Sequence, residues 1–122
     1  MNQSTEDRFG IGYLLVRYAT ALDNGDIDGI AGCFTEDEPC HRRVFGPRRH
    51  SRVFERFAAL NKRGAQLRHV LSNLAMTVDG DAAWATCQLT NIVTVDGESQ
   101  TRGNRPALAG ARVRANRWRM VA

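Results

Sequence analysis

The hydrophobic period changes once along this chain, and that change constrains the fold more than any other feature. Before Leu67, apolar residues recur at helical intervals, whereas from Leu67 onward they alternate with a period of two. Asp79-Gly80 and Asp96-Gly97 have the composition of tight hairpin turns and divide this second part into strands. Helices followed by an antiparallel meander predict an α+β fold in which the helices pack on one curved sheet.

The first part of the chain predicts three helices. The first begins near Ser4 and has one apolar stripe, made of Ile11, Leu14, Leu15, Tyr18 and Leu22. Asn24-Gly25 ends this helix, and Asp26 caps a short second one. A third helix begins near Pro47, ends at 61–64 and has an inner face of Val53, Phe54, Phe57 and Leu60. A short strand is expected at 38–45.

The second part predicts strands near 67–78, 82–95, 105–114 and 117–121, and their register decides which residues face His69. A two-residue Asp79-Gly80 turn sets His69 opposite Thr90 and puts three residues on its face, namely Trp84, Thr86 and Gln88. One more residue in the loop brings Asn91 and Val93 to that face instead. The sequence leaves both registers open. His69 and Asn73 are expected on the same face of their strand.

Length and composition predict a single soluble domain covering residues 1–122. The chain is 43% hydrophobic and 25% charged, and no apolar run is long enough to cross a membrane. Its polar, acidic N-terminus does not have the pattern of a secretory signal. Three widely spaced cysteines suggest free thiols in a reducing compartment, so we expect a cytoplasmic protein. Cys40-His41 and His50 match no zinc spacing, and we expect no metal.

The net charge of +4 raises the question of an anionic partner. Sixteen of the seventeen basic residues are arginines, and twelve of these lie in 42–56 and 102–119. Such clusters can follow phosphates, line a site for an anionic ligand, or simply form solvated faces. Because the chain has no helix-turn-helix, zinc-knuckle or aromatic RNA-binding signature, nucleic acid is not the favoured partner.

Two stretches resemble the SnoaL-like branch of the nuclear transport factor 2-like superfamily. The first runs from Arg17-Tyr18 through residues 23–30 to residues 33–37, and the second from Arg68-His69 through Asn73 to residues 78–82. The resemblance implies a cone-shaped α+β barrel, with three helices packed on a strongly bent sheet around a mostly apolar central pocket. Members include isomerases, dehydratases, polyketide cyclases and non-catalytic binders, so the fold alone does not fix the function.

The resemblance also implies roles for individual residues. His69 matches the general base of similar dehydratases, Asp23 the carboxylate that orients that histidine, and Tyr18 a phenol that donates to a substrate oxygen. On a regular helix, however, Tyr18 and Asp23 point about 140° apart. Each of the three also has an ordinary structural interpretation, as a core tyrosine, a surface aspartate and a strand-edge histidine. Pocket-lining candidates are Asn73, Trp84, Gln88, Phe54 and Phe57.

Departures from the family pattern keep two functions open. The base of the steroid isomerases would fall near Arg42, and the second histidine of scytalone dehydratase would fall near Val93; neither group is present. One hypothesis is a cofactor-independent dehydratase or isomerase acting on a small, apolar, oxygenated molecule. The other is a ligand-binding or assembly module without chemistry. The enzyme requires Asp23 within about 3.2 Å of a His69 ring nitrogen, both facing one cavity. The open sheet face predicts a homodimer.

Overall fold

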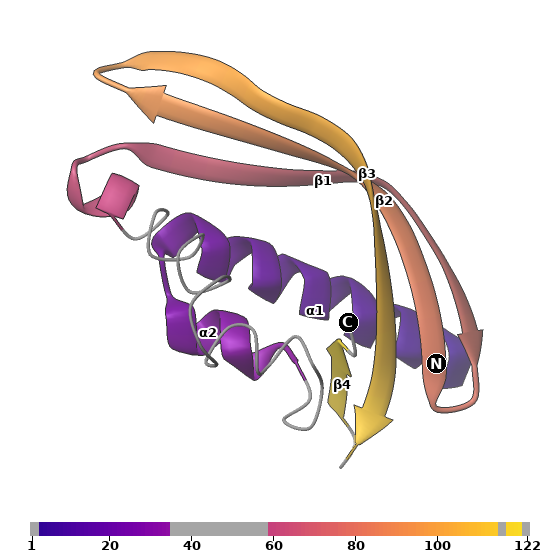
Figure 1. The fold of residues 1–122 in the computed structure, drawn as a ribbon. Coiled ribbons are helices and arrows are strands. Elements are labelled where there is room, and N and C mark those ends of the chain that lie inside the picture. The colour runs from indigo at the N-terminus through magenta and orange to yellow at the C-terminus, as the bar shows by residue number, and fades with distance from the viewer. Residues whose placement is uncertain (1–2, 35–58, 115–116, 121–122) are drawn as a thin grey trace.

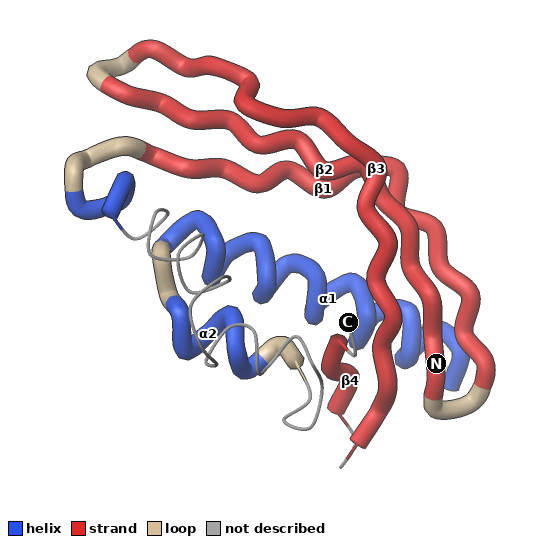
Figure 2. The backbone as a smooth tube through the Cα atoms, viewed as in Figure 1, coloured by secondary structure: helices blue, strands red, loops and turns tan. Residues whose placement is uncertain are grey.

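A computed structural model describes residues 3–34, 59–114 and 117–120 (Figure 1). Two helices, α1 (Gln3–Asn24) and α2 (Ile27–Gly32), precede four strands, which are β1 (Gln66–Asp79), β2 (Ala82–Val95), β3 (Glu98–Arg114) and β4 (Arg117–Met120). The strands form one antiparallel sheet in the order β1-β2-β3-β4. The long strands bend sharply, and α1 lies along the concave side with α2 beside it (Figure 2). The α+β prediction is confirmed.

The first two of the three predicted helices lie where the sequence indicates. The amide of Gly25 donates to the Leu22 carbonyl at 3.2 Å, and that of Asp26 donates to the Ala21 carbonyl at 2.9 Å. With Gly25 at φ 64°, these two bonds form a Schellman motif that ends α1. The Asp26 carboxylate then accepts from the Gly29 amide at 2.9 Å and caps α2. The chain therefore turns directly after α1 and leaves Asp23 in its last turn.

Most of the predicted third helix, with Phe54 and Phe57, and the short strand expected at 38–45 lie outside the described residues. Residues 59–62 form one helical turn before β1. Neither described helix is long and apolar enough to cross a membrane.

The main core lies between α1, α2 and the concave face of the sheet. Its largest buried members from the helical part are Ile11, Leu14, Leu22, Ile30 and Phe34, and those from the sheet are Trp118 and Met120. The Met120 amide donates to the Cys33 carbonyl at 2.7 Å, which joins the end of α2 to β4. A second, smaller cluster contains Leu67, Val93, Ala65 and Leu60 under the other end of the sheet.

The first hairpin turn lies one residue later than the Asp79-Gly80 turn that the sequence indicates. The turn residues are Gly80 and Asp81, because Asp79 pairs with Ala82. Gly80 has a φ of 58°, which glycine adopts without strain. This turn and the bulge in β1 between Ser72 and Ala75 together pair His69 with Asn91, which is the second of the two registers that the sequence leaves open. The second turn, at Asp96 and Gly97, has positive φ at both residues and lies where predicted.

A bulge in β1 also changes which residues share a face. The pairing with β2 shifts between Ser72 and Ala75, and Asn73 there has a φ of 54°. On both sides of the bulge the residues toward the helices are the more buried ones, namely Leu67, His69 and Leu71 before it and Met76 and Val78 after it. Uninterrupted alternation along the strand predicts Met76 and Val78 on the opposite face from His69. The extra residue in the bulge reverses the alternation and makes that assignment wrong.

Candidate functional site

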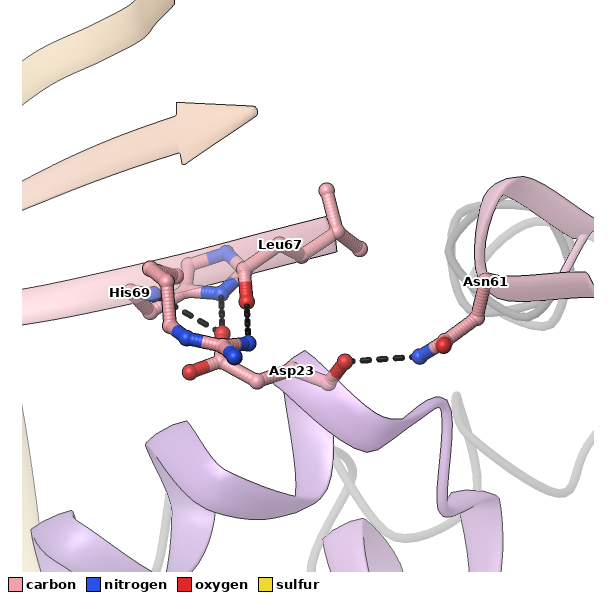
Figure 3. A network of polar contacts seen from close by, with 5 residues as sticks. Asp23, Asn61, Leu67 and His69 are labelled. Atoms are coloured by element: carbon pink, nitrogen blue, oxygen red, sulfur yellow. Dashed lines mark hydrogen bonds and ion pairs between the residues drawn. The ribbon is translucent and has the colours of Figure 1, made fainter. Parts of the chain in front are cut away.

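The centre of the candidate site is a contact between the last turn of α1 and the start of β1. The Asp23 carboxylate oxygen Oδ1 lies 2.7 Å from the His69 ring nitrogen Nδ1 (Figure 3). The same oxygen accepts the His69 backbone N–H at 2.8 Å. The side chains of Asp23 and His69 are 14% and 5% exposed, so the contact is largely shielded from water. The distance that the enzyme hypothesis requires is met.

The contact between Asp23 Oδ1 and Nδ1 determines which ring nitrogen of His69 carries a hydrogen in the neutral ring. A carboxylate can only accept, so Nδ1 carries the ring hydrogen and donates it to Asp23. In this neutral tautomer the basic lone pair belongs to Nε2, which points away from the carboxylate. Asp23 thus orients the ring and would stabilise its protonated form.

This contact is possible because β1 is an edge strand. Among the described strands, none lies next to its N–H and C=O groups that point away from β2. The Asp23 carboxylate accepts a hydrogen bond from the edge N–H of His69. The Arg68 guanidinium donates to the edge carbonyl of Leu67 at 2.6 Å (Figure 3). The Asn61 side chain donates to the Asp23 backbone carbonyl at 2.7 Å and ties the end of α1 to the turn before β1.

Asn91 on β2 is the cross-strand partner of His69. Because the His69 N–H points away from β2, the two residues form a non-hydrogen-bonded antiparallel pair, in which side chains approach most closely. Both side chains lie on the concave face. The Asn91 carbonyl oxygen Oδ1 is buried and has no hydrogen-bond partner within the described part of the chain.

Tyr18 lies on the inner stripe of α1, as expected. Its ring packs edge-on against Phe34 at a centroid distance of 5.8 Å and contacts the main core cluster. Leu71, two residues after His69 on the same strand face, packs against that cluster too. Donation from the Tyr18 hydroxyl to a ligand stays a prediction.

Three of the pocket-lining candidates lie away from the Asp23–His69 pair. Trp84 is 61% exposed, between the buried Ala83 and Ala85, so it points to the convex face. Gln88, also an even-numbered residue of β2, shares that face by strand alternation. Asn73 is exposed at the bulge in β1. The expectation that Trp84 and Gln88 share a face with His69 was wrong, because it depended on the rejected register.

Sequence reasoning assigned no role to two residues of this neighbourhood. Asn91 appeared only as an outcome of the alternative register, and choosing that register needed the turn at Gly80 and Asp81. Asn61 was read only as the end of a helix, because a side chain that reaches a distant backbone carbonyl leaves no periodic signal.

Other potential chemistry on this face is limited in the part of the chain that is described. No three His, Cys, Asp or Glu side chains among residues 3–34, 59–114 and 117–120 are grouped so that they could hold a metal. Burial raises the pKa of the Cys87 thiol, which disfavours the nucleophilic thiolate. A groove of about 390 Å³ between α1 and α2 is lined by Tyr13, Arg17 and Thr20, among others, and does not include the Asp23–His69 pair. A single central pocket therefore stays a prediction.

The bent antiparallel sheet around a long helix matches the fold of a solved nuclear transport factor 2-like protein from Novosphingobium aromaticivorans, which is 23% identical, with a TM-score of 0.75 over 98% of this chain and 80% of that one. The model of the SnoaL-like domain family matches residues 3–122, and the chain therefore belongs to this family. Among curated proteins, none is significantly similar in sequence.

Solved structures with the same fold come from proteins whose described functions differ. A protein of unknown function from Mycobacterium tuberculosis is 21% identical, with a TM-score of 0.77 over 99% of this chain and 73% of that one. A proposed aromatic ring hydroxylase from Novosphingobium aromaticivorans is 26% identical, with a TM-score of 0.67 over 96% and 85%. A proposed dehydratase of the NTF2-like family from Streptomyces avermitilis is 16% identical, with a TM-score of 0.70 over 98% and 94%.

Proposed function

We propose that this protein is a cofactor-independent acid–base enzyme, a dehydratase or isomerase, that acts on a small, apolar, oxygenated molecule. The observation that carries the proposal is the 2.7 Å contact between Asp23 Oδ1 and His69 Nδ1, in a shielded position on the concave face. A histidine held in this way is suited to take a proton on Nε2 at neutral pH.

In the proposed reaction, His69 Nε2 removes a proton from a carbon next to a carbonyl group. The C–H electron pair moves into the new double bond, and negative charge develops on the carbonyl oxygen, to which Tyr18 would donate a hydrogen bond. Protonated His69 then returns its proton. Return to a different carbon gives isomerisation, and return to a leaving hydroxyl, which departs as water, gives dehydration. Asp23 stabilises the charged imidazole throughout.

The chemistry can be tested without the natural substrate, by using an apolar bicyclic ketone with acidic C–H bonds as the probe. We expect the protein to accelerate exchange of the α-hydrogens of 2-tetralone for deuterium in D₂O, followed by proton NMR. His69→Gln should remove about a hundredfold or more of this acceleration, the typical contribution of one general base. Thr86→Val, on the convex side of β2, serves as the control and should leave the rate unchanged. Equal acceleration by the wild-type protein and His69→Gln would contradict the proposal.

One observation favours a second candidate, a non-catalytic ligand-binding or assembly module. Asp23 Oδ1 also accepts the backbone N–H of His69, and this bond alone could explain a structural aspartate at a sheet edge. In that case ligands would bind with no exchange of their C–H bonds.

We further propose that the protein is a cytoplasmic homodimer that pairs through its sheet. The convex face exposes Val70 and Trp84, which are 44% and 61% exposed, and pairing would cover them. The thiols of Cys33 and Cys87, which are not joined in disulfides, support the proposed reducing compartment.

A further inference from the structure

The groove between α1 and α2 lies apart from the Asp23–His69 pair. Its volume of about 390 Å³ is within the range of about 300–1,000 Å³ that is usual for small-molecule pockets. The two helices approach each other closely beside it, because a Cβ atom at Gly29 would lie only 3.2 Å from that of Ala21. These two small residues line the groove together with longer side chains of α1, which leaves room for a ligand.

Arg17 brings a positive charge to this groove. Its carbon Cζ lies 5.7 Å from the centre of the Tyr13 ring, within the range of a cation–π contact. The nitrogen Nε is covered and has no hydrogen-bond partner, and no carboxylate of the described residues pairs with this guanidinium. Because part of the group has lost its water, its charge is less screened than that of a fully solvated arginine. An anion in the groove would therefore be attracted strongly.

The side chains around Arg17 suit a ligand with a polar end and an apolar body. Thr20 and Asn24 follow Arg17 by three and seven residues, so all three lie on one face of α1. Both are exposed, and their hydroxyl and carboxamide groups can donate hydrogen bonds to an anion. Tyr13 and Val16, which are 66% and 55% exposed, add apolar surface beside these donors.

One carboxylate, that of Asp26, is among the described residues that line the groove, and it limits the charge of the ligand. Its Oδ1 accepts the Gly29 amide at 2.9 Å and caps α2. A ligand with two negative charges, such as phosphate, would be repelled by this carboxylate. A planar monocarboxylate carries one charge and matches the fork of N–H groups on a guanidinium.

From these observations we infer that the groove between α1 and α2 binds a small aromatic carboxylate. The carboxylate accepts hydrogen bonds from the terminal nitrogens of Arg17, while the covered Nε stays behind them. The aromatic ring of the ligand packs against Tyr13 and Val16. This inference goes beyond the proposed function and does not depend on it, because the groove does not include the Asp23–His69 pair.

The experiment compares two probes that have the same shape but differ in charge, 2-naphthoate and 2-naphthamide. Binding to the full chain is measured by equilibrium dialysis at pH 7 and low salt. We expect the wild-type protein to bind 2-naphthoate about tenfold or more tightly than the amide, as one charge-assisted hydrogen-bonded contact would give. Arg17→Met, which is similar in length but uncharged, should reduce this preference to near unity.

A matched control separates this groove from general attraction to a basic protein. Arg102→Met removes the same charge at an exposed residue of β3, which lines a different groove at the second hairpin, and should keep the preference. Thr20→Trp adds bulk at an exposed residue of the α1–α2 groove and should weaken 2-naphthoate about tenfold, which provides the test if Arg17→Met does not fold.

The inference is overturned if the wild-type protein binds neither probe or does not prefer 2-naphthoate. It is also overturned if Arg17→Met keeps the preference, if Arg102→Met loses it, or if Thr20→Trp binds 2-naphthoate as the wild-type protein does. Exchange of the 2-tetralone α-hydrogens should be the same in Arg17→Met and in the wild-type protein, so this inference and the proposed function can fail separately.

Discussion

At the scale of single residues, one carboxylate oxygen of Asp23 accepts two hydrogen bonds, and the two have different consequences. Its bond to the His69 backbone N–H satisfies a donor at the edge of the sheet. Its bond to Nδ1 orients the imidazole ring. The first needs only an acceptor. The second also uses the negative charge, because that charge stabilises the protonated ring.

Substitution at Asp23 should therefore separate structure from chemistry. Asp23→Asn keeps an oxygen that can accept the His69 N–H, so we expect a loss of less than about 1 kcal/mol in the free energy of unfolding. Asp23→Ala removes both bonds to a charged group and should cost about 2–3 kcal/mol. Urea denaturation followed by circular dichroism measures both values.

The catalytic proposal adds a second expectation for the same pair of variants. Asp23→Asn should lose most of the exchange activity on 2-tetralone although it remains folded. If Asp23→Asn folds and keeps full exchange activity, the negative charge of Asp23 plays no part in catalysis, and the residue has only a structural role.

At the scale of elements, the sequence predicted which segments form helices and strands because their signals are local. The Asn24-Gly25 stop, the Asp26 cap and the period of two after Leu67 each depend on neighbouring residues. Register is not local, because the bulge near Asn73 and the turn at Gly80 decide it together. A shift of one residue moved Trp84 to the convex face and brought Asn91 beside His69.

The same distinction applies to the candidate site. His69 and Asp23 could be selected from a family resemblance, although 46 residues separate them. Asn91 could not, because only the observed register of the paired strands places it opposite His69. The β3 strand also begins earlier than predicted, at Glu98 instead of 105, because it pairs with the whole of β2.

The packing of α1 on β4 gives a prediction for two glycines in one helix. A Cβ atom at Gly10 would lie 2.9 Å from Cδ1 of the buried Trp118 ring, whereas one at Gly12 would meet nothing described within 4 Å. Gly12→Ala should stabilise the protein by up to about 1 kcal/mol, because alanine favours the helix. Gly10→Ala should instead destabilise it, since overpacking costs about 1–3 kcal/mol and exceeds that gain.

Thermal and urea unfolding of the two variants provide the measurement, with each serving as the control for the other. Equal stabilisation by both substitutions would mean that Trp118 does not pack against Gly10 as described.

At the scale of the whole molecule, the described residues form two exposed apolar surfaces to which a partner could bind. One is the convex face of the sheet with Val70 and Trp84, and the other is the outer side of α1 with Phe9, Tyr13 and Val16. The first lies on a broad sheet, where two copies related by a twofold axis can bury a continuous area. The second is a single helical stripe, which offers less area.

Homodimer formation through the sheet is therefore expected to depend on Trp84. The wild-type protein should have the mass of a dimer in light scattering at micromolar concentration, and Trp84→Glu should have that of a monomer, because a buried unpaired carboxylate opposes pairing. Phe9→Glu introduces the same charge at a residue that is 67% exposed on α1 and should remain dimeric. If Phe9→Glu dissociates while Trp84→Glu stays dimeric, the copies pair through α1. A wild-type monomer would contradict dimerisation itself and leave the convex face uncovered in solution.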